Sequence, residues 1–326
     1  MGEALGSASE PSEINSEEWR SALSGAGVYF EYTAPVRLSV LDGWLGARMP
    51  EMAEDVEIRR VCVVFGEDRS RIYYEDCASG LFYGADTASS AGKAQELEIY
   101  SPNGALFAFE SGIIHAENAP YTLIMQGREH PDINTSAAGS AVELLDITLT
   151  ALGHSNELNT TFTESDGTLQ RIGTQFRIRA ELSGRVLYRR TDIQSPDGER
   201  PELSESEMIE MARAVAADTI GKTCGGAEVF FESFEPVTGD TGSVVFGYYI
   251  AGGRVNLIEE RHAARVTFRS GVITDVELDF RNFTLAGELT RLLPERQAFA
   301  AAEGEFMLCY PDSGAEVNQP AWVIKN

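Results

Sequence analysis

The sequence predicts an α+β protein made of antiparallel meander sheets with packed helices, arranged as two to three similar helix-plus-sheet units. Two observations predict this class. A helix with a polar cap and a glycine end occurs three times, and after each one the apolar residues change from helical spacing to the alternation of a strand. Short Ser-Gly turns separate several successive strands, which is typical of antiparallel hairpins and not of parallel crossovers.

The three helices share one pattern at their first residues. A side-chain oxygen at the cap is followed three positions later by a glutamate, and the pair satisfies free backbone N–H groups of the first turn. These pairs are Asn15 with Glu18, Ser140 with Glu143, and Ser204 with Glu207. A glycine then ends each helix, because it can adopt the left-handed conformation that closes the last turn. These glycines are Gly25, Gly153 and Gly221.

Alternating apolar residues predict the strands. The expected segments are 28–32, 175–180, 185–190, 227–234, 244–250, 262–268 and 272–280. Near the C-terminus, Pro294 at a first-turn position predicts a helix over 293–302. A last strand is expected at 321–325, and its Trp322 is the best single candidate for the core.

Neighbouring aromatic residues on the strands should point to opposite faces, one to the core and one to solvent. Examples are Tyr73-Tyr74 and Tyr248-Tyr249. Exposed members could form a recognition surface, although filling out a sheet is the commoner role.

One hairpin can be predicted in detail. Arg269-Ser270-Gly271 fits a three-residue loop, and this register sets Arg265 opposite Asp275. Asp275, Glu277 and Asp279 then share one face, which we expect to be exposed to solvent. A calcium site is the less favoured alternative, because calcium takes six or more oxygens from a curved loop and not from a straight strand.

Turn-rich segments suggest where the chain divides. We expect a disordered lead at 1–14, an N-terminal α+β domain at 15–131, a linker over 130–139, a middle α+β domain at 140–194, and a C-terminal α+β domain at 202–326. Ser195-Pro-Asp-Gly-Glu-Arg-Pro201 has the composition of a domain linker. In an alternative arrangement, the middle and last units share one sheet and this segment is a crossing loop.

The strongly acidic composition limits the possible partners. With 51 Asp and Glu against 26 Lys and Arg, the net charge is −25, which argues against a nucleic-acid partner and against anionic lipid surfaces. No apolar stretch is long enough for a membrane helix. Residues 1–15 have neither the basic start nor the apolar core of a signal peptide.

No group of residues predicts catalysis. The sequence has no phosphate-binding loop, no G-x-S-x-G elbow and no H-E-x-x-H motif. His115, His130, His154 and His262 are scattered singly, which gives no metal site. We therefore predict no enzyme, no catalytic, cofactor-binding or metal-binding residues, and no cofactor.

The cysteines follow no known motif either. Cys62, Cys77, Cys224 and Cys309 include no C-x-x-C pair, and their even count permits disulfides without requiring them. We expect buried free thiols, with Cys62 on a buried strand. Cys62 or Cys224 could form a dyad with a distant histidine, but nothing in the sequence brings them together.

The C-terminal segment 203–326 resembles the YycH/YycI-type regulatory proteins of Gram-positive bacteria. The resemblance lies in the order of several segments: Glu207-Met-Ile-Glu-Met-Ala-Arg, a hairpin around Gly242, strands 264–268 and 272–276, Leu292-Leu-Pro-Glu-Arg-Gln-Ala298, and Gln319-Pro-Ala-Trp-Val-Ile324. Segments 27–32 and 38–45 also look like these proteins, so the similarity extends toward the N-terminus. Small PepSY-like modules share the same helix-plus-sheet pattern.

The resemblance implies a non-enzymatic, extracytoplasmic protein that is tethered by one N-terminal membrane helix, which this sequence lacks. Such proteins act with a cell-wall-controlling sensor histidine kinase and a sister regulator, as accessories of a two-component system. We therefore expect a regulatory protein that binds and modulates such a kinase. The alternatives are a PepSY-like module that inhibits a protease or binds a ligand, and a cell-wall hydrolase that uses a carboxylate pair.

Overall fold

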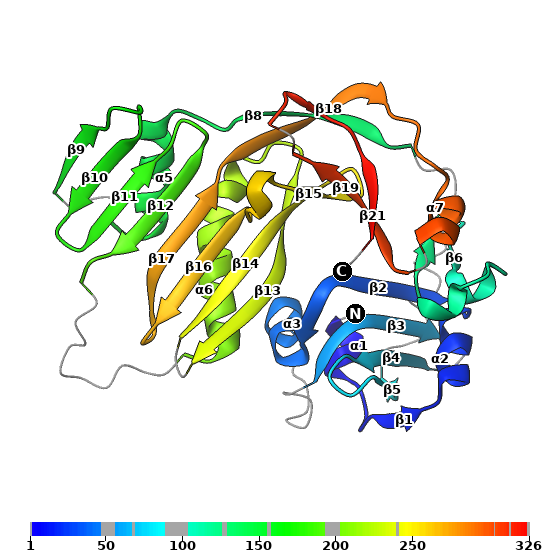
Figure 1. Cartoon of the computed structure of the whole chain (residues 1–326). Coiled ribbons are helices and arrows are strands. Elements are labelled where there is room, and N and C mark those ends of the chain that lie inside the picture. The colour runs from blue at the N-terminus through cyan, green and yellow to red at the C-terminus, as the bar shows by residue number, and fades with distance from the viewer. Residues whose placement is uncertain are drawn as a thin grey trace. The chain divides into compact units, whose positions relative to one another are not determined.

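The computed structural model describes residues 2–46, 56–66, 69–88, 104–125, 129–154, 158–192, 203–238, 241–302, 304–312 and 314–324 (Figure 1). The chain forms two compact units, Met1–Ser101 and Pro102–Asn326. Helices combine with predominantly antiparallel sheets in both units, which confirms the α+β class. The proposed linker at 195–201 lies outside the described residues.

The first unit is a five-stranded antiparallel sheet with helices on both faces. Its strands follow the order β1-β5-β4-β3-β2. The elements are α1 (Gly2–Gly6), β1 (Ser12–Ile14), α2 (Ser16–Leu23), β2 (Gly27–Arg37), α3 (Leu38–Leu45), β3 (Glu57–Phe65), β4 (Ser70–Asp76) and β5 (Leu81–Thr87).

The helix α2 begins as predicted. The Asn15 side chain accepts hydrogen bonds from the backbone N–H groups of Glu17 and Glu18 at 3.0 and 2.9 Å. The helix covers one face of the sheet, where Trp19 stacks on Phe82 with ring centroids 5.2 Å apart.

The other face of this sheet is also covered, since α1 contacts β4 and α3 contacts β2. Tyr73 and Tyr74 are therefore both buried, and the prediction that one of them faces solvent was wrong. The alternation of a strand separates core from solvent only where one face is open, as it does for buried Tyr248 and half-exposed Tyr249.

The predicted disordered lead at 1–14 is instead ordered over the described residues 2–14. Residues 2–6 form α1, whose Leu5 is buried, and 12–14 form β1, which pairs antiparallel with β5. Glu13 lies opposite Tyr83 in this pairing. The composition suggested disorder because the segment is rich in Gly, Ser and Glu, but a free sheet edge and a small apolar contact are enough to order it.

The second unit contains the larger sheet. Its elements up to the middle of the chain are β6 (Leu106–Phe107), η2 (Ala108–Glu110), η3 (Ala116–Asn118), β7 (Leu123–Ile124), β8 (Pro131–Ala137), α5 (Ala141–Ala151), β9 (Asn159–Thr163), β10 (Leu169–Gly173), β11 (Phe176–Ala180) and β12 (Arg185–Arg190). The rest are α6 (Glu205–Asp218), η4 (Ile220–Lys222), β13 (Glu228–Thr238), β14 (Thr241–Ile250), β15 (Gly253–Asn256), η5 (Ile258–Glu260), β16 (Ala264–Arg269), β17 (Val272–Asp279), β18 (Arg281–Leu289), α7 (Glu295–Ala302), β19 (Phe306–Pro311), β20 (Val317–Asn318) and β21 (Ala321–Ile324).

Eleven strands form this sheet, in the order β21-β19-β15-β14-β16-β17-β12-β11-β10-β9, with β13 on the second edge of β14. The helix α5 packs on β11, and α6 packs on β13, β14 and β16. Both helices cover the same face, as Figure 1 shows. This face contributes the core, including the fully buried side chains of Phe176, Val266 and Phe268.

The sheet joins two of the predicted domains. β12 in the middle segment pairs antiparallel with β17 in the C-terminal segment, and β8 pairs with β18 in a separate three-stranded sheet of the same unit. The chain accordingly passes from one compact unit to the other between residues 101 and 102, and not near 131–140 or 194–202. The second unit therefore follows the alternative arrangement, in which the middle and C-terminal segments share one sheet. Backbone pairing between segments far apart in sequence makes them one structural unit.

The predicted register of one hairpin was wrong by one to two residues. Ser270 and Gly271 both have left-handed backbone, with φ of 49° and 70°, and form a two-residue turn that pairs Arg269 with Val272. A further shift between Thr267 and Phe268 sets Arg265 opposite Glu277 and not opposite Asp275.

Trp322 is half-buried and not at the centre of the core. It packs on Phe306, with ring centroids 5.0 Å apart, and its indole N–H donates to the Leu293 carbonyl at 2.8 Å. It lies at the border of a small cluster whose buried members include Phe299 and Phe306. The strand was predicted correctly, but β21 is the last strand of the sheet, so its side chains are covered from fewer directions.

Candidate functional site

The face of the large sheet opposite α5 and α6 carries a set of paired charges. We call this surface the open face. Its ion pairs connect neighbouring strands: Arg185 with Glu277, Arg189 with Asp275, Arg254 with Glu232, and Arg265 with Glu235. Since the side chains alternate between faces, the apolar members of the same strands point toward the helices. The open face is therefore rich in arginine and in acidic residues, and the exposure of these charges ranges from that of half-buried Glu232 to that of largely exposed Arg189.

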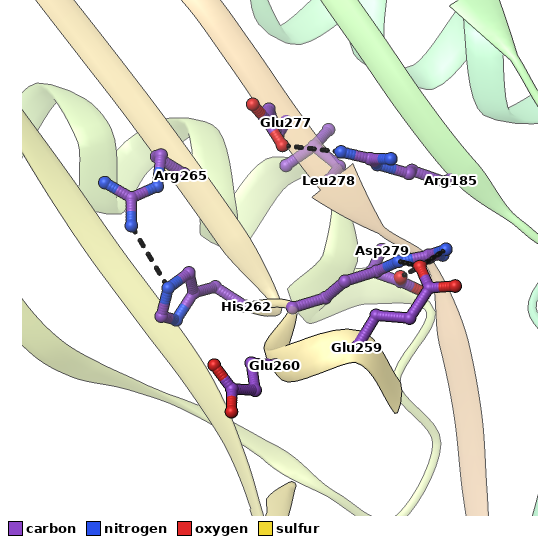
Figure 2. A pocket seen from close by; sticks show the side chains of 9 residues that line it. Arg185, Glu259, Glu260, His262, Arg265, Glu277, Leu278 and Asp279 are labelled. Atoms are coloured by element: carbon purple, nitrogen blue, oxygen red, sulfur yellow. Dashed lines mark hydrogen bonds and ion pairs between the residues drawn. The ribbon is translucent and has the colours of Figure 1, made fainter. Parts of the chain in front are cut away.

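A pocket of about 240 Å³ lies on the open face at the start of β16 (Figure 2). It is lined by Arg185, Glu259, Glu260, Arg261, His262, Arg265, Glu277, Leu278 and Asp279. Figure 2 shows Glu277 directed toward Arg185 and Arg265 directed toward His262. The Arg185–Glu277 distance is 3.0 Å. Most of the charges in this pocket already have a partner of opposite sign.

Asp279 is the most deeply buried charged group of the pocket. Its side chain is only 2% exposed, and it lies 3.4 Å from Arg261 and 3.1 Å from Arg281. Burial raises the pKa of Asp279 above its ordinary value, although the charges of Arg281 and Arg261 oppose that shift. Arg281 extends the network to Asp312 at 3.7 Å. The prediction that Asp279 faces solvent was therefore wrong.

His262 lies between a carboxylate and a guanidinium. Its Nε2 is 3.1 Å from an Nη of Arg265, and its Nδ1 is 3.3 Å from a carboxylate oxygen of Glu232. An arginine can only donate, so Nε2 accepts and the ring proton lies on Nδ1, directed toward Glu232. Burial opposes the ionisation of Glu232, but the hydrogen bond with His262 and the charge of Arg254 outweigh it and hold the pKa of Glu232 below its ordinary value.

The turn that precedes this histidine has an uncommon backbone. Glu259 and Glu260 both adopt the left-handed region, with φ of 59° and 55°. Such a conformation costs on the order of 1 kcal/mol for a residue with a side chain. The turn places Arg261 between two carboxylates, since the guanidinium forms ion pairs with Glu259 and with Asp279.

This arrangement is that of a structural salt-bridge network and not of an acid–base pair. A glycosidase-type pair needs two carboxyl groups that face a substrate across a gap. Here a guanidinium stands between Glu259 and Asp279, and Arg185 holds Glu277. Among the described residues, no group of three or more His, Cys, Asp or Glu side chains could hold a metal ion.

The cysteine that was expected on a buried strand lies there. Cys62 is buried on β3 and donates to the Ala22 carbonyl at 3.7 Å, and burial raises its pKa to about 12. Cys224 donates to the Ala227 carbonyl at 3.0 Å. Neither thiol hydrogen-bonds a histidine within the described part of the chain, so the possible dyad is not formed. All four cysteines are free thiols; Cys62, Cys224 and Cys309 are buried, as predicted, whereas Cys77 is only partly buried.

The sequence alone did not predict the open face. The usable signal was the alternation of Arg185 and Arg189 on one strand against Asp275 and Glu277 on another. These strands are far apart in the chain, and only the pairing of β12 with β17 brings the charges together.

Among the described residues, no helix is long and apolar enough to cross a membrane.

The comparisons with known proteins give a structural match. No protein-family model matches the sequence, and no curated protein sequence matches it. The structure is similar to that of YycH from Bacillus subtilis, with a TM-score of 0.60 and 10% sequence identity, over 97% of this chain and 84% of that chain. Because the similarity includes both compact units and not only the C-terminal segment, this chain has a YycH-type fold.

Proposed function

We propose that this protein is a non-enzymatic, extracytoplasmic regulator that binds and modulates a cell-wall-related sensor histidine kinase, together with a sister regulator. Its attachment to the membrane is through an N-terminal helix separate from the folded units described above. The observation that carries the proposal is the backbone similarity to YycH over 97% of the chain. The resemblance of segments 203–326 to the same group of regulators supports it from the sequence.

The ion-paired side chains that line the pocket also support a binding role. In the network around Asp279, ion pairs hold the carboxylates in place, whereas catalysis needs at least one group that is free to exchange a proton with a substrate. A regulator needs only a surface whose affinity differs between two states of its partner.

We assign the partner contact to the open face. Its arginines and acids are held by cross-strand ion pairs and are directed away from α5 and α6. Arg189 is 77% exposed in its pair with Asp275, so it can exchange that partner for an acid on another protein. Contacts of this kind contribute mainly to the association rate and to specificity, and salt weakens them.

The test uses the full-length protein with its native start and a sensor kinase that keeps its extracellular region and membrane helices. We expect the two proteins to co-purify from membranes and the kinase output to change when the regulator is deleted. No association, together with unchanged kinase output, would contradict the proposed function.

Two variants test the surface. Arg189→Glu reverses one charge on the open face and should weaken the association. Arg213→Glu is the matched control, because Arg213 pairs with Glu210 at 2.7 Å on the exposed side of α6 and lies outside the open face. Equal weakening by both would assign the effect to net charge, and no weakening by either would move the contact away from the open face.

A further inference from the structure

A second pocket, with a volume of about 380 Å³, lies on the helix-covered side of the large sheet, and we call it the helix-side pocket. Small-molecule sites typically have volumes of about 300–1,000 Å³. The open face is on the other side of the sheet, so this pocket is separate from the one described above. Its walls are mainly apolar and come from three parts of the fold: Leu152 at the end of α5, Met211, Ala214 and Val215 on α6, and Val272 and Ile273 on β17.

One wall of the helix-side pocket belongs to a buried aromatic stack. The ring centroid of His154 lies 4.8 Å from that of Phe176 and 5.7 Å from that of Tyr188. The His154 Nε2 and the Tyr188 hydroxyl oxygen are 2.9 Å apart, at hydrogen-bond distance. All three side chains are buried, so close packing holds them in place. This wall is therefore formed before any ligand arrives.

Arg190 brings a positive charge to the same wall. Side chains alternate along a strand, so Arg190 is on the same side of β12 as the buried Val186 and Tyr188. Its register partner in β11 is the fully buried Phe176. The Arg190 Nε donates to the Asp192 carbonyl at 3.2 Å, and within the described part of the chain its guanidinium forms no ion pair. A half-buried cation beside apolar side chains thus lacks an anion, although acids outnumber bases 51 to 26 in this chain.

We propose that the helix-side pocket binds a small carboxylic acid with an apolar body. The carboxylate forms an ion pair with Arg190, and the body fills the space between α5, α6 and β17. A guanidinium can donate two parallel N–H bonds to one carboxylate. Because Arg190 is half-buried, water and salt screen this pair less than an exposed one. The apolar body leaves water in the same step, which adds to the binding free energy.

The acid that lines the pocket already has a cation of its own. Asp218 on α6 forms an ion pair with Lys222 at 2.8 Å, so Arg190 keeps its charge for a ligand. A peptide segment is a less suitable occupant, because its backbone N–H and C=O groups would lose water against mainly apolar walls. A free acid has one charged group and needs one cation. The chemistry of the pocket therefore fits a small acid better than the end of a protein chain.

The first experiment is isothermal titration calorimetry of the whole chain with octanoate. Octanoate joins one carboxylate to an apolar chain, and it should bind saturably with one site per protein. Octan-1-ol has the same body without the charge, and it should bind at least about tenfold more weakly because hydrogen bonds to a charged group are lost. An absence of saturable octanoate binding, or equal binding of octan-1-ol, would overturn the proposal.

Variants of the cation test the ion pair in the same titration. Arg190→Gln removes the charge and should weaken octanoate binding at least about tenfold. Arg190→Lys keeps the charge without the planar guanidinium and should weaken binding less. Arg177→Gln is the matched control, because Arg177 is exposed on β11 and lies opposite Arg189, on the open-face side of the sheet. Octanoate binding by Arg190→Gln that equals binding by the wild type would also overturn the proposal.

A second pair of variants tests the position of the ligand and decides the question if Arg190→Gln fails to fold. Ala214→Trp fills the helix-side pocket from α6 and should abolish octanoate binding. Ala217→Trp places the same side chain on that helix at a position that does not line the pocket, and it should bind like the wild type. Both alanines are exposed, so both variants should fold, as circular dichroism can verify. Equal octanoate binding by the two variants would place the ligand elsewhere and contradict the proposal.

Discussion

Arg261 lies 3.4 Å from the carboxylate of Asp279, and this contact connects the turn before β16 with the end of β17. Asp279 is buried, so its charge depends on Arg261 and Arg281 for compensation. The contact is thus the centre of the network under the pocket.

Replacing Arg261 with Met should destabilise the protein by about 2–3 kcal/mol, because a hydrogen bond to a buried charge is lost while Asp279 stays buried. Urea unfolding followed by circular dichroism measures the change. Arg189→Met is the control on the same face and should cost about 0–1 kcal/mol, since its ion pair is exposed. Equal effects would show that burial does not determine the strength of these pairs.

Glu232 should contribute a pH-dependent part of the stability. Its folded pKa is below its ordinary value of 4.5, so its contribution is present above that value and is lost as the pH falls through the folded pKa. Glu232→Gln should therefore be destabilising at pH 7, and the difference from the wild type should shrink as the pH falls below about 4.5. Thermal unfolding between neutral and acidic pH measures this. A difference that stays constant over that range would contradict the assigned role.

The cap of α6 should be a separable source of stability. The Ser204 hydroxyl accepts from the backbone N–H of Glu207 at 3.3 Å, and the Glu207 carboxylate accepts from the backbone N–H of Ser204 at 2.8 Å. Ser204→Ala should cost about 1 kcal/mol, whereas Ser204→Asp should cost little because Asp also caps well. Thermal unfolding of both variants tests the difference.

Alkylation should distinguish the thiols by exposure. Cys77 is the partly exposed cysteine, whereas Cys62, Cys224 and Cys309 are buried. Iodoacetamide should therefore label Cys77 first. The reaction should still be slower than with a free cysteine, because burial and the nearby charge of Glu75 raise the pKa of Cys77. Mass spectrometry of the folded protein measures the order, and early labelling of Cys62 would contradict it.

Trp322 should matter less than a central core residue of the same unit. Trp322→Ala removes a half-buried ring and one hydrogen bond, whereas Phe268→Ala removes a fully buried ring. Phe268→Ala should cost about 3–5 kcal/mol, and Trp322→Ala should cost less because part of its surface is already in water. Urea unfolding of both variants gives the comparison.

Local structure was the part that the sequence predicted best. The caps at Asn15, Ser140 and Ser204 all form, and α5 ends before Gly153, whose φ is +80°. β12 spans the predicted residues 185–190. These features depend on neighbours within a few residues, so the sequence contains what determines them.

Long-range pairing was the part that the sequence could not supply. The open face exists because β12 pairs with β17, which sets Arg189 against Asp275. The bulge in the hairpin changed the partner of Arg265, and the network around Asp279 joins residues at the ends of η5, β17, β18 and β19. The pattern of neighbouring residues in the sequence cannot predict such contacts, because they depend on which strands become neighbours in the sheet.

The sequence by itself determined the α+β class, the caps and turns, and the charge that argues against a nucleic-acid partner, since each depends on local pattern or on composition. Only the tertiary structure decided that the middle and C-terminal segments share one sheet, that Asp279 is buried, and that Arg265 lies opposite Glu277. The physical reason is that burial and strand register are properties of residues brought together from distant parts of the chain.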